Sequence, residues 1–255
     1  MDFLSLLALA LAPGTAIGIY IYLKDKHERE PLALLLVSFL YGSLSAIITL
    51  VLSMSLEFVL VAKDPEVQAD VVSKFIEAFF KVALVEEFSK FIFVRFVLFN
   101  NKNFNEPFDG IVYAVTVSLG FATLENVLYV FQSESGFTTG IIRMFSAVPA
   151  HATFGVLMGY FLGKAKFSPT NKLFYTILAL AAATIFHGSY DYFLFVGEVK
   201  GVWTGIWLGA LASLVTGFVL SRAAIRLHQQ ASPFIHPKSD PVDGLQNDSP
   251  EELQG

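Results

Sequence analysis

Residues 32–60 read LALLLVSFLYGSLSAIITLVLSMSLEFVL, a run in which only Glu57 is charged. About 20 consecutive apolar residues are enough for an α-helix to cross the hydrocarbon core of a bilayer. This run is long enough to span a membrane with some tilt, or to end in an interfacial turn before the polar segment 63–70. It therefore predicts a transmembrane helix.

The same pattern continues on both sides of this run, because apolar stretches alternate with short polar breaks. The chain is 55% hydrophobic and 15% charged, with a mean hydropathy of +0.61, whereas soluble domains have about a quarter of their residues charged. We expect an all-α, polytopic membrane protein of about seven transmembrane helices, the first of them an uncleaved span. The predicted spans are 3–23, 32–60, 75–99, 108–131, 139–163, 173–195 and 203–227.

The C-terminal segment has a different composition from the spans. Residues 229–255 contain four prolines and several acidic residues, with almost no large apolar ones, which predicts a disordered extension outside the membrane. The membrane domain would then be 1–228. No basic patch or nucleic-acid-binding motif is present, so the bilayer is an expected partner and nucleic acid is not. The absence of cysteine excludes disulfides and thiolate metal sites.

Basic residues are unevenly divided between the two sets of polar breaks, and cytoplasmic loops carry the excess of lysine and arginine. This imbalance predicts a multi-pass protein of the cell membrane with its N-terminus extracytoplasmic and its C-terminus cytoplasmic. The expected cytoplasmic set is Lys24, Lys26, Arg29, Arg95, Lys102, Lys164, Lys166, Lys172, Arg222 and Arg226, against Lys63, Lys74, Arg143 and Lys200 in the opposite set.

Ionisable side chains inside the spans are costly, at roughly 2.5–3.5 kcal/mol each near the centre of a helix, so they are expected to face partners or a wet cavity. Counting the helical rise from the span ends places the glutamates and histidines of four spans at compatible depths in the outer half of the bilayer. The ionisable residues of the third to sixth spans include Lys81, Glu86, Glu87, Lys90, Glu125, His151, His187 and Asp191.

The spacing of these residues predicts contacts within single helices. Lys90 is three residues after Glu87 and four after Glu86, so it can pair with either carboxylate. His187 and Asp191, four residues apart, lie on one helix face. Adjacent glutamates differ by about 100° around a helix. We therefore expect one of the two glutamates in a cavity and the other held by a basic partner.

Carboxylates and imidazoles around a wet cavity are suited to activating water, and two arrangements are open. In one, His151, His187 and Glu125 bind zinc, which leaves a position for water and a glutamate as the base. In the other, no metal is needed, because Glu86 takes a proton from water while His187 and Asp191 stabilise the developing oxyanion.

The motifs resemble those of a known family. Glu86–Lys90 reads EExxK, Phe121–Glu125 reads FxxxE and is followed by Asn126, and His187–Asp191 reads HxxxD. In this order, with His151 in a stretch rich in small residues, they resemble the PrsW family of bacterial intramembrane proteases. The wider superfamily includes CAAX prenyl endopeptidases and bacteriocin-immunity membrane proteins. The resemblance covers roughly residues 1–227.

This resemblance implies hydrolysis of a peptide bond in a membrane-anchored protein, such as an anti-sigma factor, on the extracytoplasmic side. By motif, Glu86 corresponds to the water-activating glutamate. Glu125 stands where the prenyl endopeptidases have a histidine, and Asp191 stands where they often have asparagine. These two additional carboxylic acids favour a metal ion in the site or require one of the acids to stay protonated. The expected catalytic residues are Glu86, Glu87, Lys90, Glu125, His187 and Asp191, and the expected metal ligands are Glu125, His151 and His187.

Two other functions could explain ionisable residues at this depth. A proton- or ion-coupled transporter also concentrates acids and histidines in the membrane, although the absence of an internal repeat disfavours it. A non-catalytic immunity or scaffold protein could retain the fold without hydrolysing anything.

Overall fold

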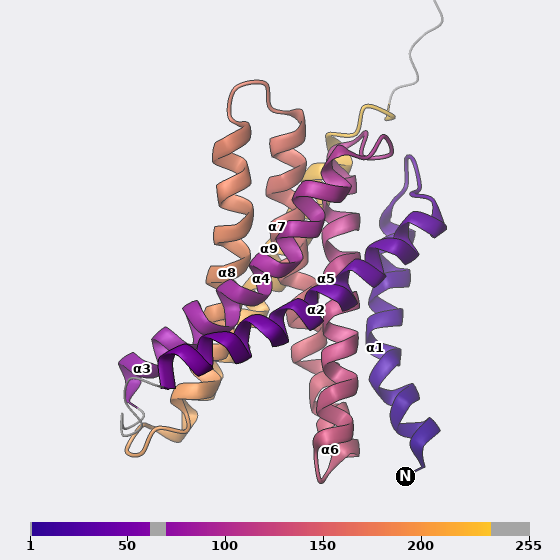
Figure 1. Ribbon diagram of the computed structural model, residues 1–255. Helices are drawn as coiled ribbons and strands as arrows, with labels where there is room; N and C mark the ends of the chain where they lie inside the picture. The colour runs from indigo at the N-terminus through magenta and orange to yellow at the C-terminus, as the bar shows by residue number, and fades with distance from the viewer. Residues whose placement is uncertain (1, 62–69, 236–255) are drawn as a thin grey trace, which may run out of the picture.

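Apolar helices of membrane-spanning length make up most of the computed structural model, which describes residues 2–61 and 70–235. All regular secondary structure in these two ranges is helical, as the sequence predicts. Within these ranges, six segments of 22 to 32 residues each are long and apolar enough to cross a bilayer. Figure 1 shows their arrangement. They are formed by α1 (Phe3–Lys24), α2 (Leu32–Val61), α5 (Pro107–Gln132), α6 (Gly136–Phe145) with α7 (Ala147–Phe167), α8 (Lys172–Val196), and η4 (Thr204–Trp207) with α9 (Leu208–Gln230).

The predicted third span, 75–99, corresponds to a seventh, composite helix that carries too much charge to count among the six. It runs without interruption from residue 71 to residue 100 but changes its winding several times. Its parts are α3 (Val71–Ile76), the π-helix η1 (Glu77–Ala83), α4 (Leu84–Ile92), the π-helix η2 (Phe93–Val97) and the 3-10 turn η3 (Leu98–Asn100). π-Helical turns are rare and are often found at functional sites. Here they flank α4 on both sides.

The predicted fifth span, 139–163, is broken close to Pro149. The break falls at Ser146, where φ is −123° and ψ is −80°, and it separates α6 from α7. Pro149 is the third residue of α7. A proline is tolerated there because the first backbone N–H groups of a helix have no partner within the helix. The second helix of this span, α7, therefore begins two residues before the proline.

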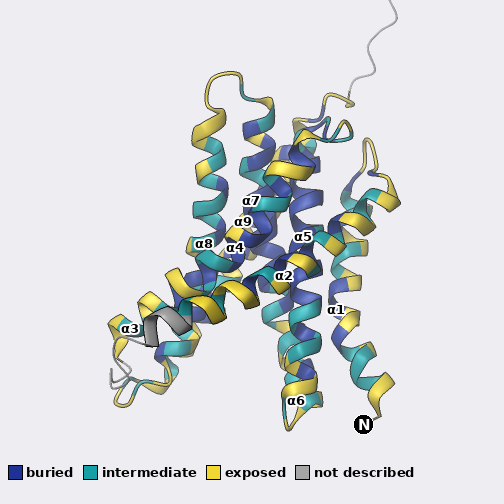
Figure 2. Cartoon of the chain, in the orientation of Figure 1, coloured by how far each residue is buried: buried dark blue, intermediate teal, exposed yellow. Residues whose placement is uncertain are grey.

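Helices α5 and α7 form the centre of the bundle, and Figure 2 shows them as the most deeply buried elements. Their backbones approach so closely that a Cβ atom added to Gly159 would overlap the carbonyl oxygen of Gly110. Gly155, one turn earlier, lies close to the side chain of Ser118 and to the backbone of Val115. Small residues at this four-residue spacing are typical of tightly packed transmembrane helices.

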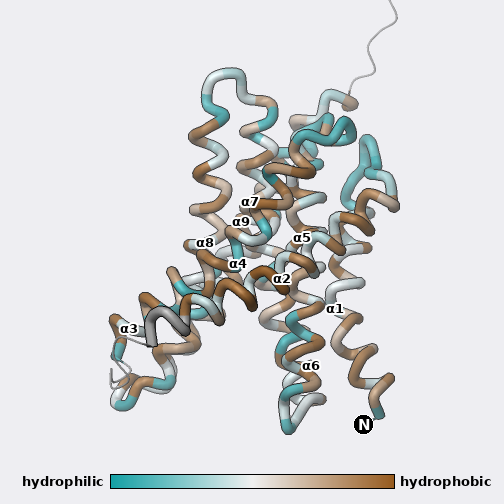
Figure 3. The backbone as a smooth tube through the Cα atoms, in the orientation of Figure 1, coloured by the Kyte–Doolittle hydropathy of each residue, from teal (hydrophilic) through white to brown (hydrophobic). Residues whose placement is uncertain are grey.

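The outer helices expose apolar side chains, which are suited to contact with lipid. Leu36 of α2 is 62% exposed, Ile177 of α8 is 59% exposed and Phe218 of α9 is 55% exposed. Figure 3 shows hydrophobic residues along the helices and hydrophilic ones gathered at the connections. The protein is therefore a multi-pass membrane protein. The polar segment 63–69 and residues 236–255 of the predicted tail lie outside the described residues.

The connections between helices gather at two ends of the bundle (Figure 1). The N-terminus lies at the same end as the α5–α6 and α8–α9 connections. Segments 25–31, 101–106 and 168–171 lie at the opposite end, together with the C-terminal end of α9. These two ends match the two groups of polar breaks predicted from the sequence.

Candidate active site

The structure brings the predicted site residues together from four helices, although their segments are far apart in the sequence. Lys90 of α4 is fully buried and is at the centre of the cluster. Its Nζ atom lies 2.7 Å from Oε1 of Glu87, 3.5 Å from Oε2 of Glu86 and 3.1 Å from Nδ1 of His151. The ammonium also lies 3.9 Å from the ring centroid of Phe121, in a cation–π contact.

The two adjacent glutamates have different surroundings, as their positions on a helix predict. Glu87 is fully buried and is held by Lys90 and by Nδ1 of His187, which lies 2.8 Å from Oε1 of the glutamate. Glu86 lines a cavity of about 300 Å³, together with Glu125, His151, His187 and Asp191. Only Glu86 of this pair is placed to meet a ligand in that cavity.

His187 is fixed in position by contacts on both edges of its ring. Nδ1 donates to Glu87, while Nε2 lies 3.1 Å from Oδ2 of Asp191 and 3.9 Å from Oε2 of Glu86. The ring stacks on Phe154 with 4.7 Å between ring centroids. A buried carboxylate on one nitrogen of a histidine fixes the orientation of the other nitrogen, as in many metal sites.

His151 connects Lys90 with Glu125. Because a lysine ammonium can only donate, Nδ1 of His151 accepts from Lys90, and Nε2 carries the proton and donates to Glu125 over 3.0 Å. His151 and His187 lie edge to face, with 5.2 Å between ring centroids. The imidazoles and the carboxylates thus form one continuous network.

Arg143 of α6 and Asn126 of α5 belong to the same network, and neither is among the site residues predicted from the sequence. Arg143 donates to Oε2 of Glu125 over 2.6 Å and to Oδ1 of Asn126 over 3.0 Å. Asn126 in turn donates to the carbonyl oxygen of Ala10 in α1 over 2.9 Å. Asn126 directly follows Glu125 in the sequence, which was a usable signal. Arg143 was counted only as a loop charge, although it lies inside the predicted fifth span.

The charges of the cluster do not balance when both imidazoles are neutral. Four carboxylates face only two permanent cations, so two negative charges remain. These carboxylates belong to Glu86, Glu87, Glu125 and Asp191, and the cations to Lys90 and Arg143. A divalent metal ion or two additional protons would neutralise the cluster.

Four buried residues of this cluster could hold a metal ion. Glu86, Glu87, His151 and His187 each offer a ligand atom, and these atoms lie within 4.8 Å of one another. Glu125, which was predicted as a ligand, is not one of the four and instead contacts His151. Oε2 of Glu87 is buried without a hydrogen-bond partner among the described residues. An unpartnered carboxylate oxygen and two imidazoles form a donor set that fits a metal ion such as zinc.

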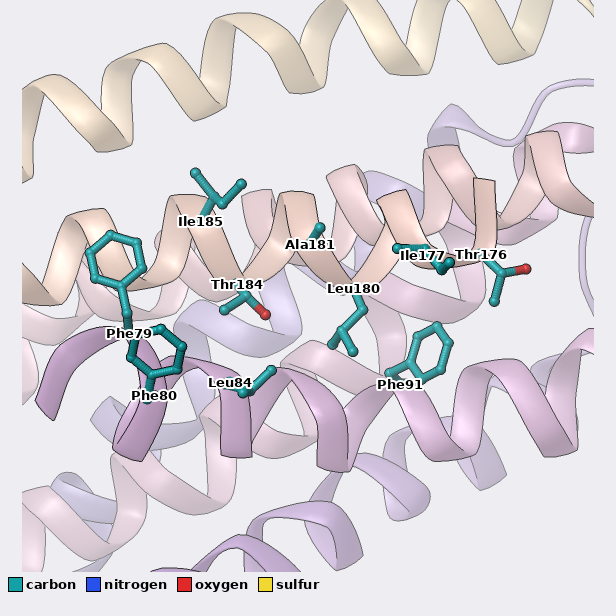
Figure 4. A pocket seen from close by; sticks show the side chains of 10 residues that line it. All are labelled: Phe79, Phe80, Leu84, Phe91, Thr176, Ile177, Leu180, Ala181, Thr184 and Ile185. Carbon is teal, nitrogen blue, oxygen red and sulfur yellow. The ribbon is translucent and has the colours of Figure 1, made fainter. Parts of the chain in front are cut away.

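A larger groove, of about 540 Å³, lies away from this chemistry. Figure 4 shows its lining side chains, which come from η1, α4 and α8 and are almost all apolar. Phe80 and Ile185 in this lining are more than half exposed, so the groove opens on the outer surface of the bundle. None of the charged residues of the cluster lines it.

Comparison with known proteins shows the family of the chain. Residues 30–225 match the family model described as "PrsW family intramembrane metalloprotease". A protein of Geobacillus kaustophilus named Protease PrsW is 38% identical over 93% of this chain and 96% of its own length. Proteins of the same name from Oceanobacillus iheyensis and Bacillus subtilis are 40% and 35% identical, over 75% and 74% of this chain and 83% of each relative. No solved structure matches the chain.

The match to this family model extends over the cluster residues, from Glu86 in α4 to Asp191 in α8. The similarity to proteins named as proteases favours an enzyme over a transporter or an immunity protein. The chain belongs to the PrsW family of intramembrane proteases.

Proposed function

We propose that the protein hydrolyses a peptide bond of a membrane-anchored substrate and that Glu86 activates the attacking water. The observation that carries the proposal is the position of Glu86. Its carboxylate lines the cavity, while the neighbouring Glu87 is enclosed by Lys90 and His187. A carboxylate at the wall of a polar cavity can accept a proton from water, which an enclosed one cannot.

The reaction can be followed from the residues that line the cavity. Glu86 takes one proton from water as the oxygen of that water bonds to the carbonyl carbon of the substrate. Arg143 and His187 stabilise the negative charge that develops on the carbonyl oxygen. The carbon–nitrogen bond then breaks, and Glu86 passes its proton to the leaving nitrogen. The products are a carboxylic acid and an amine.

The other predicted catalytic residues act by positioning. Glu87 and Asp191 orient His187 from opposite edges of its ring. Glu125 orients His151 through the hydrogen bond to Nε2. Lys90 neutralises Glu87, so that two adjacent carboxylates can remain in one buried cluster.

We further infer that the metal of this metalloprotease family is zinc in this chain and that His151, His187 and Glu87 would hold it, which leaves Glu86 as the base. Imidazole and carboxylate groups are preferred zinc ligands, and catalytic sites use three of them. Zinc in this position would supply Lewis-acid activation of water and of the scissile carbonyl. The contacts from Glu87 to His187 and from Glu125 to His151 would orient the two imidazoles toward it.

The location of the cluster supports cleavage near the extracytoplasmic face. Asp191 lies five residues before the end of α8 at Val196, and Glu125 lies seven residues before the end of α5 at Gln132. Both of these helix ends are at the N-terminal end of the bundle (Figure 1), which the distribution of basic residues assigns to the outside. The C-terminus is then cytoplasmic. A single-span protein such as an anti-sigma factor is a suitable substrate.

A reporter library would test this function. Single-span membrane proteins with randomised residues in the outer half of the span and the adjoining extracytoplasmic segment are reconstituted with the purified protein, and new N-termini are mapped by mass spectrometry. We expect cleavage by the wild type and none by His187→Ala, with both proteins folded. A wild type that cuts no reporter but carries ions in flux assays would contradict the proposal, as would cleavage by His187→Ala at the normal rate.

A further inference from the structure

A second cavity, of about 270 Å³, lies on the other side of the catalytic carboxylates. It is bounded by α2 and α5, whereas the first cavity is bounded by α6, α7 and α8. Both cavities are lined by Val82, Glu86, Glu125 and Tyr129. These four side chains therefore form the boundary between the two cavities, and the water-activating Glu86 is accessible from both.

The second cavity exists because α2 and α5 cross and then diverge. At the crossing, Gly42 and Gly120 allow backbone contact, since a Cβ atom on either would overlap a carbonyl oxygen of the other helix. Beyond the crossing, α2 runs obliquely toward α3 while α5 continues along the bundle (Figure 1). The residues of α2 that line the cavity, at 46, 49, 50 and 53, all lie on one helix face.

The lining of this cavity is suited to a peptide with an apolar side chain. Ala46 is nearly fully buried and presents only a methyl group, and Leu50, Phe121 and Leu128 add apolar surface. The lining also has polar groups, and among them the buried hydroxyl of Thr49 has no hydrogen-bond partner in the described part of the chain. Leaving a buried hydroxyl unpaired is unfavourable, because its hydrogen bonds to water are lost without replacement. This group is therefore available to a ligand.

The cavity also has an opening toward the outside of the bundle. Leu50 is 47% exposed and Tyr129 is 51% exposed, although both line the cavity. A substrate segment can therefore enter between α2 and α5 from the side and reach Glu86 without passing through the tightly packed α5–α7 centre.

We propose that this second cavity, between α2 and α5, is the subsite for the substrate side chain on one side of the scissile bond. Ala46 limits the size of that side chain, and the hydroxyl of Thr49 forms a hydrogen bond with the substrate backbone. The inference rests on the proposed function. Successive side chains of an extended peptide point to opposite faces, so a peptide whose scissile bond is at Glu86 directs the two flanking side chains into different cavities. The 300 Å³ cavity receives the other side chain.

Size preference at the cut bond tests this subsite. With the reporter library, we expect Ala46→Leu to lower cleavage of reporters that carry a large apolar residue at one flanking position by about 10-fold or more, since one or a few methylenes discriminate substrates to this extent. Reporters with glycine or alanine at that position should be cut at close to the normal rate. Leu50→Ala enlarges the same cavity and should shift the preference toward larger residues. Because Leu50 is half exposed, this variant also covers the case in which Ala46→Leu does not fold.

The hydroxyl of Thr49 is tested separately. Thr49→Val keeps the shape and should raise KM with little change in kcat, while Thr49→Ser should restore the normal KM. The matched control for Ala46→Leu is Ala181→Leu. It makes the same change of side chain in the outer groove of Figure 4 and should leave the size preference of the protease unchanged. If Ala46→Leu and Leu50→Ala leave the preference unchanged in a protein that cuts reporters, the subsite is wrong. A wild type that cuts nothing instead contradicts the proposed function.

Discussion

Replacing Lys90 with methionine should destabilise the protein strongly, because this lysine is fully buried, neutralises Glu87 and also contacts Glu86. Its contact with Glu87 measures 2.7 Å. Coulomb's law gives about 6 kcal/mol for this separation at an effective dielectric constant of about 20. Removing one partner of a buried ion pair costs about 3–5 kcal/mol in practice. At about 2–4 °C per kcal/mol for a chain of this size, the melting temperature should fall by about 6–20 °C.

Thermal unfolding of the purified protein in detergent measures this effect. Lys81→Met is the matched control, because Lys81 is on the same composite helix but is exposed, and its melting temperature should stay within about 2 °C of the wild type. Adding Glu87→Gln to Lys90→Met removes the uncompensated charge and should restore at least half of the loss. Equal melting temperatures for Lys90→Met and Lys81→Met would refute the assignment of Lys90 as the neutralising cation.

Three further outcomes are expected. Burial raises the pKa of Asp25 and of Glu30, which donates its backbone N–H to Asp25, to about 7 each. Folding therefore favours their protonated forms, and the melting temperature should fall as the pH rises from about 4 to above 7. The fall should be less steep in Glu30→Gln. A melting temperature that does not depend on pH would contradict this prediction. Gly159→Leu should prevent folding, because the leucine side chain would displace α5 from α7. The loss of the monodisperse peak in size-exclusion chromatography measures this effect, and normal yield and activity would contradict the close contact. Metal analysis should find about one zinc per chain, lost in His151→Ala, and full activity in chelator with no bound metal would eliminate the zinc proposal.

The spans were predictable from the sequence because each is an apolar run between polar breaks. Hydrophobicity alone does not report the winding of a helix, so the π-helical parts beside α4 were not predicted. They add residues per turn without changing composition. The break between α6 and α7 lies close to Pro149, but its position at Ser146 depends on backbone angles that a sequence does not show.

Contacts within one helix were also predictable, because the three- and four-residue spacings around Lys90 and between His187 and Asp191 determine which side chains meet. Contacts between helices were not. Arg143 reaches Glu125 only because α6 folds back beside α5, and the cavity at Ala46 depends on the angle at which α2 crosses α5. The contacts of Glu125, which is predicted as a metal ligand, with Arg143 and His151 were likewise not predicted.

The central claim is that Glu86 activates water for peptide hydrolysis, and the rate of reporter cleavage by Glu86→Gln in proteoliposomes tests it most directly. The substitution preserves size and removes the proton-accepting carboxylate. We predict that kcat falls by about 100- to 10,000-fold, which is the usual contribution of a general base, while the melting temperature does not decrease. A Glu86→Gln protein that cuts the same reporters within about threefold of the wild-type rate would contradict the claim.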